Sequence, residues 1–581
     1  MKSNASDFLK LMQHVYDDAC IKCSADVSDL RDLETMRARV KEEGISFLTI
    51  TLPSFARDLE RALEQRVIDS TLFRSFRKVG SGLIPAFLQG IVSQIFDRET
   101  GELNDNSAND LPTFIEAVRQ ICLLFKKVEM DCTPIRVQAA FDNFATIERS
   151  FMDLPYSQYD VAAFRHTSYV LWGNFGWDFN PSDITLRHGP GNTAEKYTPN
   201  GKYFLRRWHE RLESSFPFIG NVYPSGLPTN SREFELLTLV SEQDEQPVRV
   251  VPVPKTLKAP RIIAIEPCCM QFAQQGIRDY LYEKLESYCY TSGRINFRDQ
   301  SINRSLALES SATRQFATID LSDASDRVPA SLALEMFCAS PVLRGCIEQC
   351  RSTSAKLPDG TLVSPLKKFA SMGSALCFPV ESMYFYTICV MALLKDRNLQ
   401  CIPKNVYDVT RDIYVYGDDL IVPQANAESV LAYLQKYNCK VNTNKTFYRG
   451  NFRESCGIDA YQGYEVTPIY LGCERPKNWE QAGEIASWVA TANLFYKKGY
   501  WRTTTFMFNQ LERILGNIPY VSDTSPLLGR TSFMKFEYLW GRDASPVFRW
   551  NSDLHALEVK GVSLDPVFRE DKLGGYAALS K

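Results

Sequence analysis

A strand-turn-strand pattern at residues 413–423 constrains the fold of this chain more than any other segment. The apolar run 413–416 leads into Gly417, Asp418 and Asp419, and a second apolar run, 420–423, follows. Glycine and aspartate suit a tight turn, so the pattern predicts a hairpin of two buried strands. A plain turn would not need two adjacent carboxylates, and their repulsion has to be offset by cations. Mg²⁺ takes hard oxygen ligands and leaves positions for phosphates.

Asp320 supplies a third carboxylate at the end of a second short apolar strand, 316–321. If that strand lies beside the hairpin, Asp320 and Asp418 can bridge two Mg²⁺ ions roughly 3.5–4 Å apart. One ion would activate a 3′-hydroxyl, and the other would bind a triphosphate and stabilise the leaving pyrophosphate. This arrangement predicts in-line nucleotidyl transfer. The alternative is a helix cap at Asp320 and ordinary turn residues at Asp418 and Asp419.

The order of the predicted elements favours an α+β fold. The two strand regions are separated by long helical stretches, with helices predicted at 330–337, 381–394 and 427–437. Residues 1–70 carry apolar residues at helical spacing and are predicted to form a helical packing scaffold.

Composition restricts the function classes. The chain has 581 residues, with 66 Lys and Arg against 69 Asp and Glu, so any nucleic acid has to be held by local basic patches. The sixteen cysteines are expected to be reduced thiols, and the CxxC of Cys20 and Cys23 lacks two further zinc ligands at comparable spacing. The start of the chain does not look like a signal peptide, and the apolar stretch 383–394 is short for the roughly 20 residues that span a membrane.

A basic and aromatic patch at residues 187–211 is a candidate RNA contact, with Arg206 and Arg207 as its predicted RNA-binding residues. A solvated helix face explains the same residues about equally well. The patch contains Gly189, Gly191 and Ala194 after a possible strand at 183–188, which formally satisfies a dinucleotide-binding pattern. Pro190 removes a backbone donor from that loop, so a loop that packs or touches RNA is favoured. No P-loop pattern occurs in the chain.

A series of motifs between residues 250 and 470 gives the chain a resemblance to a known family. They are PK at 254–255, IAIEP at 263–267, DQSIN at 299–303, TIDLSDASD at 318–326, LPDG at 357–360, SMG at 371–373, YGDD at 416–419, NKTF at 444–447, FRESCG at 452–457 and VTP at 466–468. In this order they resemble the replicases, or RNA-dependent RNA polymerase beta subunits, of single-stranded RNA bacteriophages of the levivirus type. The first 180 and last 110 residues carry little that identifies the family.

The resemblance implies roles for individual residues. Asp320, Asp418 and Asp419 resemble the catalytic metal ligands, and Lys445 resembles the lysine proposed as general acid for pyrophosphate. Arg453 resembles an RNA-binding residue of the hairpin that grips the primer strand. The nucleotide-binding residues implied by the resemblance are Lys255, Lys258, Arg261, Asp326, Ser371 and Gly373.

Two departures from the family pattern bear on these roles. Ser374 stands where better-known members have Asn, and Asp326 follows Asp320 by six residues instead of five. A reverse transcriptase is an alternative function with the same chemistry. Ser325 disfavours it, because a reverse transcriptase would usually place a bulky aromatic residue there, and Gly417 disfavours it as well. A non-catalytic RNA-binding scaffold with a relic palm is the remaining alternative.

The resemblance also implies an architecture and partners. It implies a right-hand polymerase fold, with an N-terminal helical region at 1–180, fingers at 181–315, palm at 316–460 and thumb at 461–581. The expected activity is primer-independent RNA synthesis from NTPs with two Mg²⁺ ions, for which Mn²⁺ can substitute. Expected partners are template and nascent RNA, host elongation factors Tu and Ts and a host ribosomal protein. The expected location is the cytoplasm of the bacterial host, and no membrane partner is expected.

Overall fold

The chain folds into two compact units. A computed structural model describes residues 2–23, 27–78, 80, 82–104, 110–197, 200–223, 225–226, 232–534, 548–567 and 573. Unit 1 comprises Met1–Thr133, Pro254–Ala259 and Tyr464–Arg569, and unit 2 comprises Pro134–Val253, Pro260–Gly463 and Glu570–Lys581. Both units combine segments distant in sequence and cut across the four expected parts. The division into fingers, palm and thumb therefore stays a prediction.

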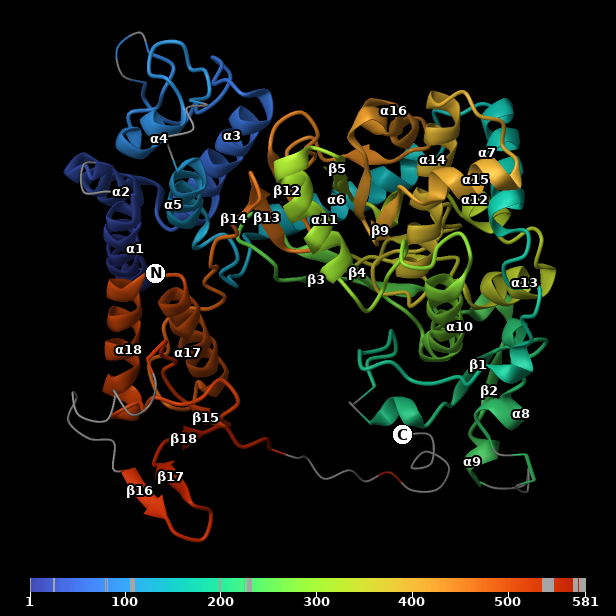
Figure 1. The fold of residues 1–581 in the computed structure, drawn as a ribbon. Coiled ribbons are helices and arrows are strands. Elements are labelled where there is room, and N and C mark those ends of the chain that lie inside the picture. The colour runs from blue at the N-terminus through green and yellow to red at the C-terminus, as the bar shows by residue number, and fades with distance from the viewer. Residues whose placement is uncertain are drawn as a thin grey trace. The chain divides into compact units, whose positions relative to one another are not determined.

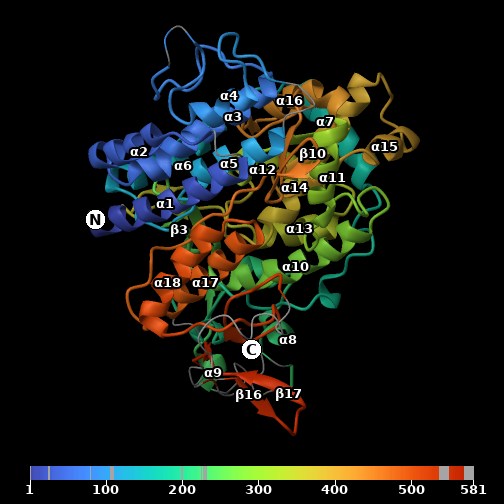
Figure 2. The same ribbon diagram turned by 60° about the vertical axis from the view of Figure 1, so that its left-hand side comes forward.

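Unit 1 is mainly helical. Its helix α1 packs against α5 and α18, and α17 packs against α18 (Figures 1 and 2). The helices predicted for residues 1–70 are confirmed as α1, α2 and α3. The elements are α1 (Lys2–Cys23), α2 (Leu30–Glu43), α3 (Leu52–Gln65), α4 (Gln89–Ile95), α5 (Leu111–Leu123), β14 (Tyr464–Glu465), α17 (Ala482–Lys497), α18 (Trp501–Leu515), β15 (Leu527–Leu528), β16 (Phe548–Asn551), β17 (Ala556–Val559) and β18 (Val562–Ser563).

Unit 2 mixes helices with short, mostly antiparallel strands, which confirms the predicted α+β class. Its helices are α6 (Pro134–Ser150), α7 (Gln158–Trp172), α8 (Phe218–Asn221), α9 (Arg232–Glu235), α10 (Cys268–Ser287), α11 (Ser301–Thr313), α12 (Ala330–Glu335), α13 (Pro341–Cys350), α14 (Cys377–Asp396), α15 (Pro403–Thr410) and α16 (Ala427–Lys436). Its strands are β1 (Arg207–His209), β2 (Thr238–Val240), β3 (Val248–Val253), β4 (Arg261–Ile265), β5 (Phe316–Ile319), β6 (Leu321–Ser322), β7 (Ala355–Lys356), β8 (Leu362–Val363), β9 (Tyr414–Tyr416), β10 (Asp419–Pro423), β11 (Lys440–Val441), β12 (Phe452–Ser455) and β13 (Ile458–Tyr461).

The central sheet of unit 2 has the order β5-β10-β9, with both pairs antiparallel. The pairing of the hairpin with the strand before Asp320 is thus confirmed. All four residues of β5 are buried, as are Leu420, Ile421 and Val422 of β10. These apolar side chains anchor the strands, so the polar residues at one end of the sheet are held on a rigid base.

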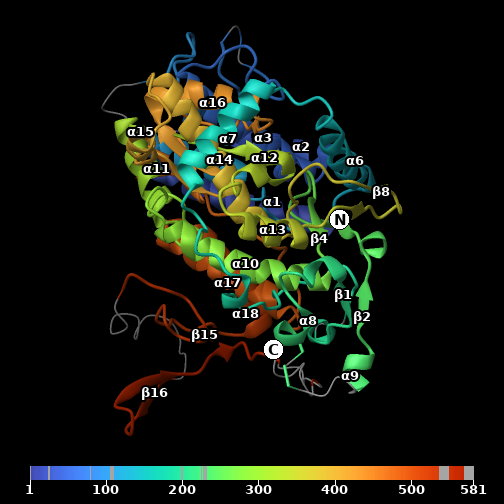
Figure 3. The ribbon, with the colours of Figure 1, turned by 90° about the vertical axis from the view of Figure 1, so that its right-hand side faces the viewer.

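Helix α14 is the core helix of unit 2. It packs against α7, α12, α15 and α16, which lie around it in Figure 3. Every residue from Val380 to Leu394 is buried, so the helix is enclosed on all its faces, and most of these residues are apolar. The helix is longer than the apolar stretch 383–394 suggests, and by length and composition it could cross a membrane, but 89% of its apolar window is buried in the protein.

A second sheet of unit 2, with the order β4-β3-β7-β8, packs against α6 around Phe141, Phe144 and Val250. The possible strand at 183–188 was wrong, because Pro181–Asp183 is a 3₁₀ turn and the residues after it are irregular. The loop that follows packs: the buried Lys202 donates to the carbonyls of Gly189 and Gly191. The ammonium therefore holds this loop from inside the protein, in line with the expectation of a loop that packs.

Candidate active site

The central sheet brings the three predicted aspartates to one end. Leu420 pairs with Ile319 and Asp419 pairs with Tyr416. Because these strands are antiparallel, the register that pairs 420 with 319 places Asp419 beside Asp320 at the end of β5. Asp418 occupies the turn between β9 and β10 and is exposed, whereas Asp320 and Asp419 are half-buried.

Gly417 makes this turn possible. It has φ +61°, and a Cβ atom at this position would lie 2.1 Å from the ring of Phe378 on α14. A two-residue hairpin loop with glycine first is the pattern of a type II′ turn, which matches the twist of the paired strands. The glycine therefore lets the turn lie directly against the core helix and fixes the position of Asp418.

Asn442, which directly follows β11, holds Asp320 in place and was not among the predicted site residues. Its amide Nδ2 donates to Asp320 Oδ2 at 2.7 Å, and its backbone N–H donates to the Asp320 carbonyl at 2.9 Å. Asn442 lies two residues before the NKTF motif, so its proximity to that motif was the available signal. The two bonds fix both the backbone and the carboxylate of Asp320.

The carboxylates at this end of the sheet repel one another. Burial raises the pKa of Asp320 to about 6; Lys445 opposes this rise and Asp418 adds to it. Burial raises the pKa of Asp419 to about 7, with further contributions from Asp418 and Asp320. The backbone N–H of Cys456 donates to Asp419 Oδ2 at 3.2 Å, which favours the charged form. A cation beside these groups would relieve the remaining repulsion.

The donor chemistry of the site fits Mg²⁺. Asp320, Asp418 and Asp419 offer the hard oxygen ligands that this ion prefers, and the repulsion between them is the electrostatic condition that favours a cation. Among the residues that the structure describes, no three His, Cys, Asp or Glu side chains already stand close enough to hold one ion. Ligation by all three aspartates therefore stays a prediction.

Lys445 lies beside this carboxylate group. Its ammonium donates to Glu454 Oε1 at 2.8 Å and lies 3.7 Å from Asp320 Oδ1. Burial lowers the pKa of Lys445, but Glu454 and Asp320 outweigh that effect and raise it well above its ordinary value. The lysine is therefore held protonated, as a general acid has to be before it donates. Glu454, also missed by the sequence analysis, is its hydrogen-bond acceptor.

Four of the predicted nucleotide-binding residues lie in unit 2, and two of them are in direct contact. Ser371 Oγ donates to Asp326 Oδ1 at 2.7 Å. Gly373 has φ +129°, and a Cβ there would lie 2.1 Å from the carbonyl oxygen of Ala264 on β4. This close approach explains why the SMG motif ends in glycine. The fourth unit 2 member, Arg261, is exposed at the start of β4.

Lys255 and Lys258 belong to unit 1 and are exposed. Partial burial lowers the pKa of Lys258, and the positive charges of Arg57 and Lys126 lower it further. Lys258, Arg57 and Lys126 of unit 1 therefore lie near one another. Such a group of positive charges is the electrostatic setting of an anion site. Binding of a triphosphate here stays a prediction.

The predicted RNA contacts differ in their exposure. Arg206 and Arg207 are exposed, and Arg207 lines an open groove of ≈ 720 Å³ together with Lys196, Arg249 and Lys356. Arg453 is 0% exposed and donates to the carbonyls of Phe316, Gly450 and Phe452. The expectation that Arg453 binds RNA is therefore corrected, because its guanidinium is used inside the protein to hold β12 against β5.

Comparison with known proteins identifies the central part of the chain. Residues 238–477 match the sequence family described as "RNA replicase, beta-chain". The chain is 37% identical over 223 residues to the RNA-directed RNA polymerase subunit beta of Qbeta virus strain MX1, covering 38% of this chain and 35% of that protein. This segment is similar to the RNA replicase beta-chain family. The RNA-directed RNA polymerase beta chain of Escherichia phage MS2 is 34% identical over 222 residues, covering 38% of this chain and 37% of the relative.

The replicase segment contains every predicted site residue except Arg206 and Arg207. The match spans only about a third of the length of the curated relatives, for example 35% of the Qbeta virus protein. The RNA-dependent RNA polymerase of a human picobirnavirus superposes with a TM-score of 0.33 and 12% identity, over 46% of this chain and 57% of that one. The BmCPV RNA-dependent RNA polymerase in its elongation state superposes with a TM-score of 0.41 and 11% sequence identity, over 81% of this chain and 45% of that chain. At these scores the likeness carries no inference about this chain.

Proposed function

We propose that this chain is the catalytic subunit of an RNA-dependent RNA polymerase that replicates a single-stranded RNA phage genome. The observation that supports this most strongly is the meeting of Asp320, Asp418 and Asp419 at one end of a buried sheet inside the replicase segment. The expected substrates are NTPs, an RNA template and the 3′-hydroxyl of nascent RNA. Initiation without a primer is part of the proposal.

Each residue has a defined task in this proposal. Asp320, Asp418 and Asp419 would hold two Mg²⁺ ions, or Mn²⁺ in their place. When bound, the ions activate the 3′-hydroxyl and stabilise the pyrophosphate that leaves. Lys445 donates a proton to the leaving pyrophosphate, and Asn442 keeps the Asp320 carboxylate oriented.

Substrate binding is divided among other side chains. Lys255, Lys258 and Arg261 contact the triphosphate through charge-assisted hydrogen bonds, and Asp326 with Ser371 contacts the ribose. Arg206 and Arg207 contact RNA phosphates. Host elongation factors Tu and Ts and a host ribosomal protein complete the replicase, which works in the cytoplasm of the bacterial host.

Incorporation of labelled ribonucleotides on a short RNA ending in cytidines, with Mg²⁺, tests the proposal with and without host lysate. Asp418→Asn is expected to abolish incorporation and to leave RNA binding largely intact, since it removes one charge from the exposed turn. Asp408→Asn is the matched control, because Asp408 is an exposed aspartate on α15 outside the site. Product that requires lysate supports the need for host subunits.

Three results would contradict the proposal in different ways. Full activity of Asp418→Asn removes the assigned metal site. Deoxynucleotide incorporation on the RNA template, in preference to ribonucleotides, identifies a reverse transcriptase instead. RNA binding without synthesis on several templates, with lysate present, supports a scaffold.

A further inference from the structure

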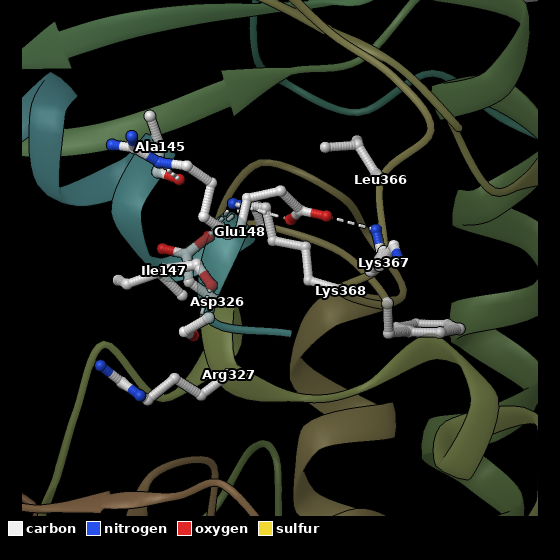
Figure 4. Close-up of polar contacts among 12 residues, drawn as sticks. Ala145, Ile147, Glu148, Asp326, Arg327, Leu366, Lys367 and Lys368 are labelled. Carbon is white, nitrogen blue, oxygen red and sulfur yellow. Dashed lines mark hydrogen bonds and ion pairs between the residues drawn. The ribbon is translucent and has the colours of Figure 1, made fainter. Parts of the chain in front are cut away.

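Lys368 is a lysine with 0% exposure, in the segment between β8 and α14 of unit 2. Its Nζ lies 3.0 Å from Asp326 Oδ1, 4.0 Å from Glu148 Oε2 and 3.3 Å from the centre of the Phe144 ring. Glu148 and Phe144 lie on α6, and Asp326 lies in the 3₁₀ turn Ser325–Arg327. Figure 4 shows Lys368, Glu148 and Asp326 converging from three segments of the chain.

The backbone around Lys368 is fixed from one side by Arg351. Its guanidinium donates to the carbonyls of Leu366 at 2.7 Å, Lys368 at 2.7 Å and Phe369 at 2.8 Å. One planar, five-donor group therefore holds three carbonyl groups of this segment. The Lys368 side chain starts from a backbone position with little freedom.

The same backbone is tied directly to the chain that follows Asp326. Ala330 N–H donates to the Lys367 carbonyl at 2.9 Å, and Phe369 N–H donates to the Val328 carbonyl at 2.8 Å. The backbone N–H of Lys367 in turn donates to Glu148 Oε1. These bonds set the separation between Lys368 and Asp326 independently of the ion pair itself.

The buried charge at Lys368 is poorly explained by stability. Removal of an ammonium from water is costly, and an apolar side chain of similar volume in place of a buried ion pair is often neutral or stabilising. A methionine at position 368 would fill the same space beside Phe144. The positive charge therefore has to be explained by what it does to its neighbours, Asp326 and Glu148.

Its effect on Asp326 is asymmetric. Lys368 Nζ and Ser371 Oγ both donate to the same oxygen, Oδ1, at 3.0 Å and 2.7 Å. No described residue donates to Oδ2, and the Asp326 side chain is 16% exposed. One carboxylate oxygen is therefore fixed from within the protein, and the other keeps its acceptor capacity for a ligand.

We propose that Lys368 is a positioning residue for nucleotide selection, which fixes Asp326 Oδ1 together with Ser371 so that Oδ2 accepts a hydrogen bond from the 2′-hydroxyl of the incoming ribonucleotide. The inference rests on the proposed polymerase function and names the residue that sets its sugar specificity. The ligand class is a ribonucleoside triphosphate. A 2′-deoxynucleotide lacks the donor and leaves Oδ2 without a partner, which the site penalises.

The test compares GTP with 2′-deoxy-GTP in single-nucleotide incorporation opposite cytidine by the full chain. Lys368→Met removes the charge and keeps the length and the contact with Phe144. We expect the ratio of kcat/KM for GTP over dGTP to fall by about tenfold, through a higher KM for GTP. The kcat/KM for dGTP should change little, because dGTP has no 2′-hydroxyl to donate a hydrogen bond to Asp326 Oδ2.

Lys367→Met is the matched control, because Lys367 is the adjacent lysine and its side chain is exposed. It is expected to keep the wild-type ratio. A second variant, Lys368→Met with Glu148→Gln, restores the balance of buried charge and keeps an oxygen for the Lys367 N–H. We expect its thermal stability to return toward wild type while the GTP preference stays low.

A cycle with Asp326→Asn completes the test. Lys368 acts through Asp326. The ratio of kcat/KM for GTP over dGTP should therefore be no lower in the double variant Lys368→Met/Asp326→Asn than in Asp326→Asn alone. Full GTP preference in Lys368→Met, or its recovery together with stability in the Glu148→Gln background, would overturn the inference while the polymerase proposal stands. A wild-type chain that incorporates no nucleotide on several templates, with host lysate present, would instead overturn the polymerase proposal itself.

Discussion

Gly417 shows how one residue can decide the geometry of the whole candidate site. It combines a positive φ with a close approach to Phe378, and each of these excludes a side chain for a separate reason. The neighbouring Asp418 is placed by that turn. At this scale the sequence predicted the turn and its carboxylates, whereas the contact with α14 had no local signal.

Gly417→Ala is therefore expected to lower nucleotide incorporation by at least about tenfold. The added Cβ has to displace the Phe378 ring or the turn, and a shift of about 1 Å at a reacting group can cost about a hundredfold in rate. The rate of single-nucleotide incorporation measures the effect. Gly293→Ala is the control, because Gly293 has φ +69° but open space around its Cα. Equal losses in both variants would assign the effect to backbone strain alone.

Asn442 gives a second prediction at the residue scale. Asn442→Ala removes the donor to Asp320 Oδ2, and loss of such a supporting bond typically costs about 10- to 100-fold in metal affinity or activity. We expect the Mg²⁺ concentration for half-maximal incorporation to rise by about tenfold or more. Asn444→Ala, two residues away, should leave it unchanged. An unaltered Mg²⁺ dependence in Asn442→Ala would show that Asp320 is oriented without this bond.

At the scale of elements, buried polar groups join helices that are distant in sequence. In unit 1, Asp32 on α2 accepts a hydrogen bond from Tyr16 on α1 at 3.0 Å and from the N–H of Leu88, just before α4, at 2.8 Å. The helices themselves follow from apolar spacing. Which polar residue joins which pair of helices depends on packing, so periodicity alone could not indicate it.

Asp32 predicts a pH dependence of stability in unit 1. Burial raises its pKa to about 6, so the folded state binds a proton more tightly than the unfolded state, whose aspartates titrate near 3.9. The free energy of unfolding should therefore fall by about 2–3 kcal/mol as pH rises from about 4 to above 6.

Urea unfolding at pH 4.5 and pH 7 checks this dependence. Asp32→Asn should reduce the difference between the two pH values, because the amide does not titrate. Asp131→Asn changes an exposed aspartate of the same unit and serves as the control. A pH dependence that survives Asp32→Asn would have to come from other groups.

At the scale of the whole molecule, the net charge of −3 leaves RNA binding to local patches. The groove lined by Arg207 and Lys356 is such a patch, because its lining holds four basic residues against Asp244 and Glu245. Two of its strands, β1 with Arg207 and β7 with Lys356, come from distant parts of the sequence. The basic segment around Arg207 could be predicted from the sequence. Its combination with Lys356 could not, since only folding brings these strands to one groove.

Arg207→Ala/Lys356→Ala is expected to weaken RNA binding and to make it less dependent on salt. Each lost phosphate contact should reduce the slope of log K against log salt by about 0.7 for single-stranded RNA. Binding titrations between low and moderate salt measure this slope. Lys404→Ala/Arg411→Ala removes two exposed cations elsewhere in unit 2 and should leave the slope unchanged. Equal slopes in both double variants would mean that RNA does not use the groove.

The sequence by itself determined what is local: the helices of residues 1–70, the strands on either side of Gly417, and the carboxylates that follow them. These features depend on side-chain period and turn chemistry over a few residues, so they are legible without a partner. The tertiary structure decided what each polar group faces. It buried Arg453 among carbonyls, joined Asn442 to Asp320 and placed Lys368 beside Asp326. Those outcomes depend on burial and on contacts between distant segments, where the cost of leaving a polar group unpaired selects its partner.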